Sequence, residues 1–404
     1  MITLERLQNG LPVVFVSGTN AVGWAGVAID AGSRDEARGE YGLAHFVEHT
    51  IFKGTRRKRA WQINSRMERV GGELNAYTTK ETTMLYSVFP QSHLDRALEL
   101  IGDLVTGSVF PALELDRERQ VVLEEAASYL DSPADAIYDD FEDLLFAGSG
   151  LGHNILGTED DVRGFTTADC RRFVDRHYGS GAMSLFVVGN YRPEHVLRLA
   201  EKHFASLSTA AHRRRQPVPP VTGAERVTRE LGLHQAHTLV GARVGSMYDD
   251  SRHALALLNN IIGGPGMNSL LNVELRERRG YVYSVESSLT SYTDCGALLI
   301  YFGCDVDHVE RVLAVVGRVI DRLASERLSE RRLDALKRQY CGQLLVASDN
   351  TELTALNAGR CLLYYGKVEP MESTIERLCA VTADELRDLA AAIALPRATV
   401  LTFH

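Results

Sequence analysis

Two histidines and a glutamate, His45, Glu48 and His49, lie within one five-residue segment of an apolar run. Glycines precede and follow this run, so residues 43–52 are predicted to form a short helix. On a helix, His45 and His49 lie one turn apart on the same face, where two imidazoles can chelate one divalent cation such as zinc. Glu48 can then take a proton from a water molecule at the metal without being a ligand itself.

The order His-x-x-Glu-His is the inverted form of the commoner zinc-protease signature His-Glu-x-x-His. A helix with two buried histidines and a surface glutamate would show the same pattern. The choice between the two interpretations therefore depends on whether the rest of the chain supplies a third ligand and a substrate site.

A catalytic zinc ion usually has three protein ligands and one open position. Candidates for the third ligand lie in a segment that is predicted to be helical as far as about Leu130. Glu118 and Glu125 share a face of that helix, whereas Glu124 points about a third of a turn away. We expect Glu125 to be the ligand and Glu118 to orient a ligating histidine. A solvated acidic helix face is the alternative, and without the histidine pair it would be preferred.

These residues resemble the pitrilysin/insulinase family of inverted zinc peptidases, in its short branch with mitochondrial processing peptidase and bacterial relatives. His45, Glu48 and His49 match the family's motif. Glu125 falls at the spacing of its third ligand, and Glu118 matches its accessory glutamate. The resemblance implies one zinc ion per chain and hydrolysis of peptide bonds.

A segment rich in Tyr and Thr follows at residues 75–86, and its alternating pattern is typical of an edge strand. An ordinary strand inside a sheet would look much the same. The resemblance matches residues 71–78 to the family's substrate-edge segment, whose free backbone edge pairs with an extended peptide. On that basis the substrate-binding residues are Asn75, Ala76, Tyr77 and Thr78.

Arg276 and Tyr283 match a further Arg/Tyr pair of the family. Hydrolysis of an amide passes through a tetrahedral oxyanion, and a phenol with a guanidinium can stabilise that charge. The resemblance implies this catalytic role for both residues. Spacing alone would favour a surface arginine and an ordinary strand tyrosine.

A repeat within the chain divides it into two similar halves. Residues 93–98 resemble residues 308–313 (308 − 93 = 215), and residues 167–169 resemble residues 382–384 at the same offset (382 − 167 = 215). Two matches at one offset indicate a duplication. Strand-like runs alternate with helical ones, and an Asn-Gly turn near the N-terminus indicates antiparallel pairing. We predict an α+β fold of two homologous α/β-sandwich-like domains, with mostly antiparallel sheets packed against helices.

The predicted boundaries place the metal site in an N-terminal domain, residues 1–212, and the Arg/Tyr pair in a C-terminal domain without metal ligands, residues 225–404. The segment between them, residues 213–224, begins basic and continues rich in proline, which predicts an exposed linker. His153 lies in a glycine-punctuated loop at 148–157. It is predicted to be a surface histidine, because three ligands are already assigned.

Composition limits the class of protein. The chain of 404 residues is long enough for two domains, and 45% hydrophobic with 24% charged residues is ordinary for a soluble globular protein. A formal net charge of −9 argues against nucleic acid as a partner. We see no signal-peptide pattern and no apolar run long enough to span a membrane, so a cytoplasmic protein without membrane contact is expected.

Together these features predict a zinc endopeptidase that acts on extended or unfolded peptides. One alternative is a peptidase that matures a precursor peptide together with a paralogous subunit. Another is a non-catalytic partner subunit, which is disfavoured because such subunits usually lose the metal motif. In the short branch of the family two chains pair around a chamber. Because this chain holds both the metal motif and the Arg/Tyr pair, we expect a homodimer, with a heterodimer as the alternative.

Overall fold

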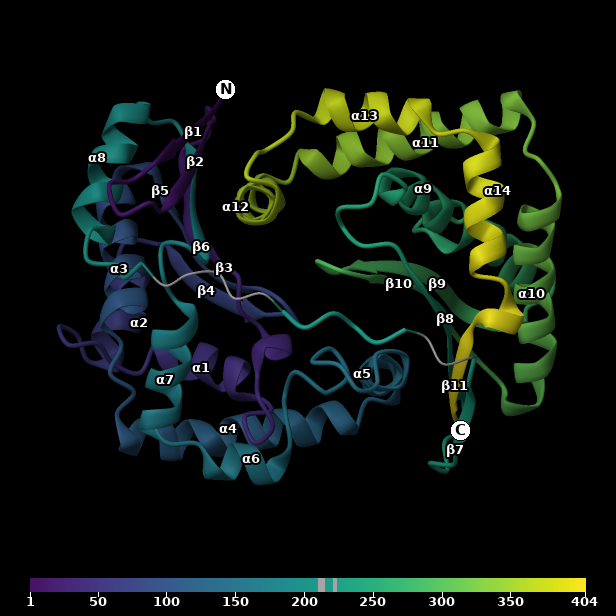
Figure 1. Ribbon diagram of the computed structural model, residues 1–404, viewed down its shortest axis with the longest axis horizontal. Helices are drawn as coiled ribbons and strands as arrows, with labels where there is room; N and C mark the ends of the chain where they lie inside the picture. Colours follow the sequence, from purple (N-terminus) through teal and green to yellow (C-terminus); the bar gives the residue numbers. More distant parts are fainter. Residues whose placement is uncertain (210–214, 221–223) are drawn as a thin grey trace. The chain divides into compact units, whose positions relative to one another are not determined.

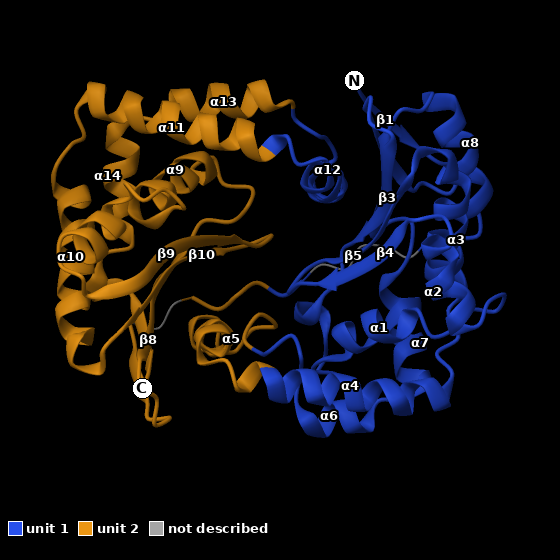
Figure 2. Ribbon diagram, turned by 180° about the vertical axis from the view of Figure 1, so that it is seen from behind, with its two compact units in different colours: residues 1–128, 153–216, 348–369 blue, residues 129–152, 217–347, 370–404 orange. Residues whose placement is uncertain are grey.

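The computed structural model describes residues 1–209, 215–220 and 224–404, and these form two compact units (Figure 2). Unit 1 consists of Met1–Ser128, His153–Gln216 and Ser348–Glu369, and unit 2 consists of Tyr129–Gly152, Pro217–Ala347 and Pro370–His404. Residues 213, 214 and 221–223 of the predicted linker lie outside the described residues. Within the described ranges each unit contains one sheet with helices packed on it (Figure 1).

The sheet of unit 1 has six strands in the described part of the chain. In spatial order they are β1 (Ile2–Arg6), β2 (Pro12–Ser17), β6 (Met183–Gly189), β3 (Val22–Ile29), β5 (Thr83–Pro90) and β4 (Glu73–Thr78). Strands β1 and β2 form the predicted Asn-Gly hairpin, with Gly10 at the positive φ of 86° that its turn requires. Strands β2 and β6 are parallel, and the other neighbours are antiparallel.

Helices cover both faces of this sheet. They are α1 (Leu43–Ile51), α2 (Ala60–Glu68), α3 (Leu94–Gly107), α4 (Ala112–Leu130), α6 (Glu159–Gly164), α7 (Thr167–His177), α8 (Pro193–Phe204) and α12 (Thr351–Tyr365), with the short 3-10 turns η1 (Ser33–Asp35) and η2 (Gln91–His93). Side chains alternate along β6, so Leu185 joins the core beneath α1, α3, α7 and α8 while Phe186 faces α12. Helix α12 lies close to the sheet because Gly359, where a Cβ would stand 2.4 Å from the ring of Phe186, leaves room for it.

Unit 2 repeats this arrangement with five described strands. In spatial order they are β7 (Arg226–Arg229), β11 (Thr399–Phe403), β8 (Ala236–Val244), β10 (Gly296–Cys304) and β9 (Val282–Ser291). The helices are α5 (Pro133–Leu145), α9 (Arg252–Gly263), α10 (Val309–Ser325), α11 (Glu330–Ser348), α13 (Met371–Ala380) and α14 (Ala383–Ala392), with the π-helix η3 (Asn272–Glu277) and the short 3-10 turns η4 (Val306–His308) and η5 (Leu395–Arg397). Helices α9, α10 and α14 pack on one face of the sheet and α5 packs on the other.

Apart from β1, the two sheets have the same topology in the described residues, which confirms the predicted α+β fold. The strand order β2-β6-β3-β5-β4 corresponds to β7-β11-β8-β10-β9, and in each order only the first two strands are parallel among the described residues. Helix α3 begins at Leu94 and α10 at Val309, which reproduces the offset found in the sequence (309 − 94 = 215). Both sheets are therefore mostly antiparallel and packed with helices, as expected from the duplication.

The compact units differ from a simple division of the chain at residues 213–224. Helix α5 comes from the first half of the chain, yet its apolar side chains Ile137 and Phe141 pack on the sheet of unit 2. Helix α12 comes from the second half, yet Ala355 and Ala358 pack on the sheet of unit 1. Each apolar helix face is buried where a sheet face would otherwise be exposed, and that requirement decides the membership of both helices.

The prediction of one strand over residues 75–86 is wrong. The structure has a hairpin there, in which β4 ends at Thr78, a turn occupies residues 79–82, and β5 begins at Thr83. Of these two strands β4 is the edge strand, because β5 lies between β4 and β3.

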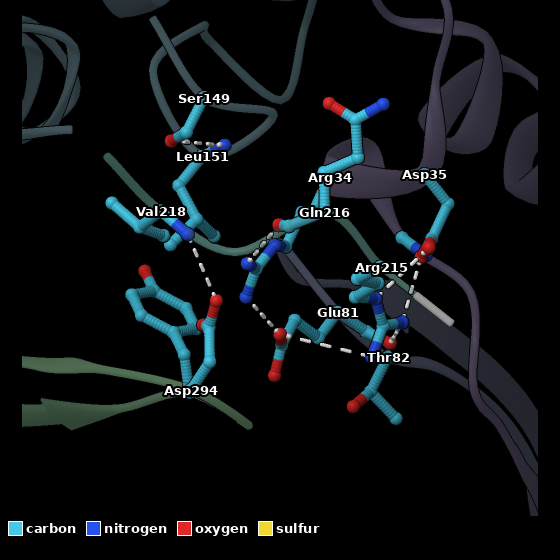
Figure 3. Close-up of polar contacts among 12 residues, drawn as sticks. Arg34, Asp35, Glu81, Thr82, Ser149, Leu151, Arg215, Gln216, Val218 and Asp294 are labelled. Atoms are coloured by element: carbon cyan, nitrogen blue, oxygen red, sulfur yellow. Dashed lines mark hydrogen bonds and ion pairs between the residues drawn. The ribbon is translucent and has the colours of Figure 1, made fainter. Parts of the chain in front are cut away.

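The prediction that the basic segment before the prolines is exposed is also wrong at Arg215, whose side chain is only 9% exposed. Its guanidinium lies 2.8 Å from a carboxylate oxygen of Asp30 and 2.7 Å from one of Asp35. Figure 3 shows the guanidinium groups of Arg34 and Arg215 directed toward the carboxylate of Glu81. Opposite charges within hydrogen-bonding distance allow these groups to be buried together.

Two features concern the chain as a whole. Among the described residues we find no helix with the length and hydropathy needed to cross a membrane. Cys170 and Cys304 are buried thiols.

Candidate active site

Helix α1 carries the three residues of the His-x-x-Glu-His motif, and it ends one residue earlier than predicted. It begins after Gly42, which has a φ of 94° and no space for a side chain, because a Cβ would lie 2.5 Å from the carbonyl oxygen of Leu156. Phe46 and Val47 are fully buried in the core of unit 1. This packing fixes the rotation of the helix and directs His45 and His49 toward α4.

The structure brings His45, His49 and Glu125 together, with one donor atom of each within 4.8 Å of the others. Nε2 of His49 lies 3.2 Å from Oε2 of Glu125, and Nε2 of His45 lies 3.7 Å from Oε1 of the same carboxylate. Burial and the neighbouring charge of His49 lower the pKa of His45 to about 3, so its ring is neutral and keeps a nitrogen lone pair. Two imidazole nitrogens and one carboxylate oxygen are a donor set that suits catalytic zinc.

Glu118 contacts the Nδ1 side of the His49 ring, and Lys53 contacts Glu118 in turn. Nδ1 of His49 lies 3.1 Å from Oε1 of Glu118, and Oε2 of Glu118 lies 2.6 Å from Nζ of Lys53. A proton on Nδ1 shared with this carboxylate leaves the lone pair of Nε2 directed toward Glu125. The sequence analysis did not identify Lys53, which lies in the turn just after α1, four residues beyond His49.

Glu48 lies on α1 beside the edge strand. Burial raises the pKa of Glu48 above its ordinary value, although hydrogen bonds from the side chain and backbone of Thr78 and the charge of His49 act in the opposite direction. Thr78 was predicted to bind substrate, and the structure places its hydroxyl against Glu48. A partly desolvated carboxylate with a raised pKa is suited to accept a proton and then donate it.

An open cavity of about 480 Å³ lies along these residues in unit 1. Glu48 and His49 line it together with Asn75 and Ala76 of β4. In the described part of the chain β4 pairs only with β5, so the other backbone edge of β4 is unpaired. Tyr77, the remaining residue predicted to bind substrate, is not part of this lining.

Arg276 and Tyr283 lie next to each other in unit 2, on η3 and β9. The guanidinium carbon of Arg276 is 5.8 Å from the ring centroid of Tyr283, at the distance of a cation–π contact. The side chain of Tyr283 is free to meet a ligand, since the residue is 82% exposed. The predicted catalytic role of this pair stays a prediction.

The prediction of a surface position for His153 is wrong, because the residue is only 8% exposed. Nε2 of His153 lies 2.9 Å from Oε2 of Glu36, and its ring stacks on Tyr41 at a centroid distance of 4.1 Å. The sequence analysis also missed Glu36, which contacts the start of α1. The two residues are 117 positions apart, so no local pattern links them.

Comparisons with known proteins show which proteins this chain resembles. A family model described as "Insulinase (Peptidase family M16)" matches residues 13–159, and one described as "Peptidase M16 inactive domain" matches residues 164–340. An "uncharacterized zinc protease" of Streptomyces coelicolor is 32% identical over 90% of this chain and 81% of its own length. Another of that description, from Bacillus subtilis, is 31% identical over 96% of this chain and 95% of its own length.

Solved structures share the fold. The crystal structure of a protease from Helicobacter pylori superposes with a TM-score of 0.92 at 23% identity, covering 100% of this chain and 99% of that one. The crystal structure of a peptidase M16 inactive domain from Pseudomonas fluorescens gives a TM-score of 0.92 at 19% identity, covering 100% and 98%. At these identities the likeness concerns the fold alone.

Proposed function

The chain belongs to the insulinase family of peptidases (peptidase family M16), and from this premise we propose that it is a zinc-dependent endopeptidase that hydrolyses extended or unfolded peptides. The observation that carries the proposal is the convergence of His45, His49 and Glu125, with Glu48 and an unpaired strand edge beside them.

His45, His49 and Glu125 would hold the zinc ion. When bound, zinc supplies a Lewis acid that polarises a water molecule and the peptide carbonyl. Glu48 accepts the proton of the attacking water and passes it to the leaving amine, for which its raised pKa is suited. Glu118 keeps His49 in one orientation and one tautomer.

The edge of β4 would bind the peptide by strand addition. Backbone hydrogen bonds along β4 give affinity without requiring a particular sequence, and they require the peptide to be extended. Asn75 and Ala76 line the same cavity as Glu48 and His49, so a peptide on this edge would pass the catalytic glutamate. Arg276 and Tyr283 would donate hydrogen bonds to the oxyanion that forms at the cleaved bond.

Two other functions remain candidates. A non-catalytic partner subunit is favoured by the match of residues 164–340 to the inactive-domain model, but the three donor residues of the other half are present and converge. A peptidase dedicated to one precursor, working with a paralogous subunit, would have the same site. Cleavage of an unbiased peptide library by the pure protein separates these candidates, because only a self-sufficient peptidase cleaves many sequences alone.

The central test measures bound zinc and peptide cleavage on the same samples. We expect about one zinc per chain, loss of metal and activity in His45→Ala and His49→Ala, and loss of activity with retained metal in Glu48→Gln. A glutamine cannot accept the proton, which is why the last variant separates the two roles. Loss of zinc in Glu48→Gln would show that Glu48 is a ligand, and a wild-type protein without zinc would refute the proposal.

A further inference from the structure

We propose that Glu36 and His153 are positioning residues for the active site, which set the position of α1 and thereby zinc affinity and turnover. This inference rests on the proposed function, because α1 carries both histidine ligands and Glu48. Neither residue belongs to the candidate metal group or to the lining of the open cavity beside it, so both would act through the start of the helix.

The carboxylate of Glu36 caps α1 from outside the helix. Its Oε2 accepts a hydrogen bond from the backbone N–H of Gly42 at 2.9 Å, and its Oε1 accepts one from the N–H of Ala44 at 2.7 Å. The first N–H groups of a helix have no partner within it, and Gly42 has no side chain with which to cap them. A carboxylate at this end also interacts favourably with the helix dipole. Glu36 therefore fixes the turn that leads directly into His45.

His153 fixes that carboxylate in turn. Its Nε2 lies 2.9 Å from Oε2 of Glu36, and its ring stacks on Tyr41 with an interplanar angle of 22°. The chain after His153 approaches α1 closely, because a Cβ on Gly157 would lie 2.0 Å from the carbonyl oxygen of Tyr41. The segment 153–157 is thus held against the entry to the helix by both side chain and backbone.

Lys80 extends the same network to the edge strand. It lies in the turn between β4 and β5, is 3% exposed, and donates from Nζ to the carbonyl oxygen of His153 at 2.5 Å. The backbone N–H of Arg34 bonds the carbonyl of Lys80 at 2.7 Å, two residues before Glu36. One buried chain of hydrogen bonds therefore connects the hairpin that bears β4 with the helix that bears the zinc ligands.

Burying the carboxylate of Glu36 costs free energy, which its hydrogen bonds must offset. Burial raises the pKa of Glu36 well above its ordinary value, while the hydrogen bonds from Ala44 and Gly42 and the charge of Lys80 lower it. An apolar cap would avoid that cost but would leave the N–H groups unbonded. A shift of α1 by about 1 Å would misplace Glu48 and can cost about 100-fold in rate.

The test compares three variants by zinc affinity, without substrate, and by peptide turnover. His153→Phe keeps the stack on Tyr41 but removes the bond to Glu36. His153→Gln keeps a donor but removes the stack. The matched control is His203→Phe, which removes a histidine–carboxylate bond of 2.7 Å to Asp95 elsewhere in unit 1.

For His153→Phe we expect zinc affinity to fall roughly 10-fold and kcat to fall by a similar factor, with KM changed less. His153→Gln should recover most of both quantities, and His203→Phe should leave both unchanged. If His153→Phe fails to fold, Glu36→Gln is the second variant, since its amide can no longer accept the N–H of Gly42 while Oε1 still accepts that of Ala44.

The outcomes separate this inference from the proposed function. If the wild type binds zinc and cleaves peptides but His153→Phe matches His203→Phe in affinity and kcat, Glu36 and His153 are merely structural and the inference fails alone. If the wild type binds no zinc, both fail. Equal losses of zinc affinity in His153→Phe and His153→Gln would also overturn it, because the bond to Glu36 would then not be the cause.

Discussion

Nδ1 of His49 lies 3.1 Å from Oε1 of Glu118, so a carboxylate one helix away sets the orientation of a predicted zinc ligand. Replacing Glu118 with glutamine should weaken zinc affinity by about 10- to 100-fold without abolishing binding. Losses of this size are usual when a residue that orients a metal ligand is replaced. Competition with a chelator of known affinity measures this directly. Unchanged affinity in Glu118→Gln would contradict the role. Lys53→Met removes the ion pair with Glu118 but leaves the carboxylate in place, so it should weaken zinc affinity less than Glu118→Gln does.

The two neighbouring glutamates of α4 should respond very differently. Oε2 of Glu125 lies 3.2 Å from Nε2 of His49, whereas Glu124 belongs to no group of candidate ligands among the described residues. Glu125→Gln should therefore remove most of the bound zinc, and Glu124→Gln should keep it. Metal content after dialysis decides the point. Greater sensitivity at Glu124 would show that the ligand assignment is off by one residue.

Tyr283 offers a test of the predicted oxyanion contact. The variant Tyr283→Phe keeps the aromatic ring over which Arg276 lies but removes the hydroxyl donor. If that hydroxyl stabilises the transition state, kcat should fall by on the order of 100-fold while zinc stays bound. Steady-state kinetics and metal content on the same sample give the answer. A drop in zinc content, or unchanged kcat, would argue against the assigned role.

The motif helix and its partner were predictable because both signals are local. His45 and His49 are four residues apart, and Glu118 and Glu125 are seven apart, so helix geometry alone places each pair on one face. The hairpin at residues 79–82 was missed for an equally local reason. Its turn contains no glycine, proline or asparagine, the residues by which turns are usually recognised.

Buried charges escaped prediction because their partners are distant in sequence. Arg215 bonds Asp35 across 180 residues, and His153 bonds Glu36 across 117. A sequence pattern shows each of these side chains as polar and therefore predicts exposure. Only the fold supplies the opposite charge that makes burial tolerable. The membership of α5 and α12 is unpredictable in the same way, since an apolar helix face does not show which sheet it will cover.

The ion pair between Glu40 and Arg176, 2.7 Å apart, gives a pH dependence of stability. Burial alone would raise the pKa of Glu40, but hydrogen bonds from Arg176 and the backbone of Ala37 bring it below the ordinary value of 4.5. A pKa lowered in the folded state means that the stabilisation is present above pH 4.5 and is lost as the pH falls through the folded-state pKa.

Arg176→Gln should therefore lower the free energy of unfolding by roughly 0.5–1 kcal/mol at pH 7, with a shrinking difference from wild type below about pH 4.5. Urea unfolding of both proteins at a series of pH values measures this difference in the free energy of unfolding. Arg163→Gln, at an exposed pair with Glu159, is the control and should change stability little. If the stability difference between Arg176→Gln and the wild type grows as the pH falls, the predicted direction of the pH dependence is wrong.

The residues that one chain holds lead to a prediction of its assembly state. This chain carries both the predicted metal ligands and the pair Arg276 and Tyr283, so its resemblance to paired short-branch peptidases gives no reason for an unlike partner. We predict a homodimer, of twice the 44.6 kDa chain mass, which is active without a second protein. It should cleave unfolded peptides and spare folded proteins, because pairing with β4 needs an extended backbone. Light scattering combined with peptidase assays on one preparation is the measurement. A fully active monomer, or a homodimer that stays inactive until a paralogous chain is added, would contradict the prediction.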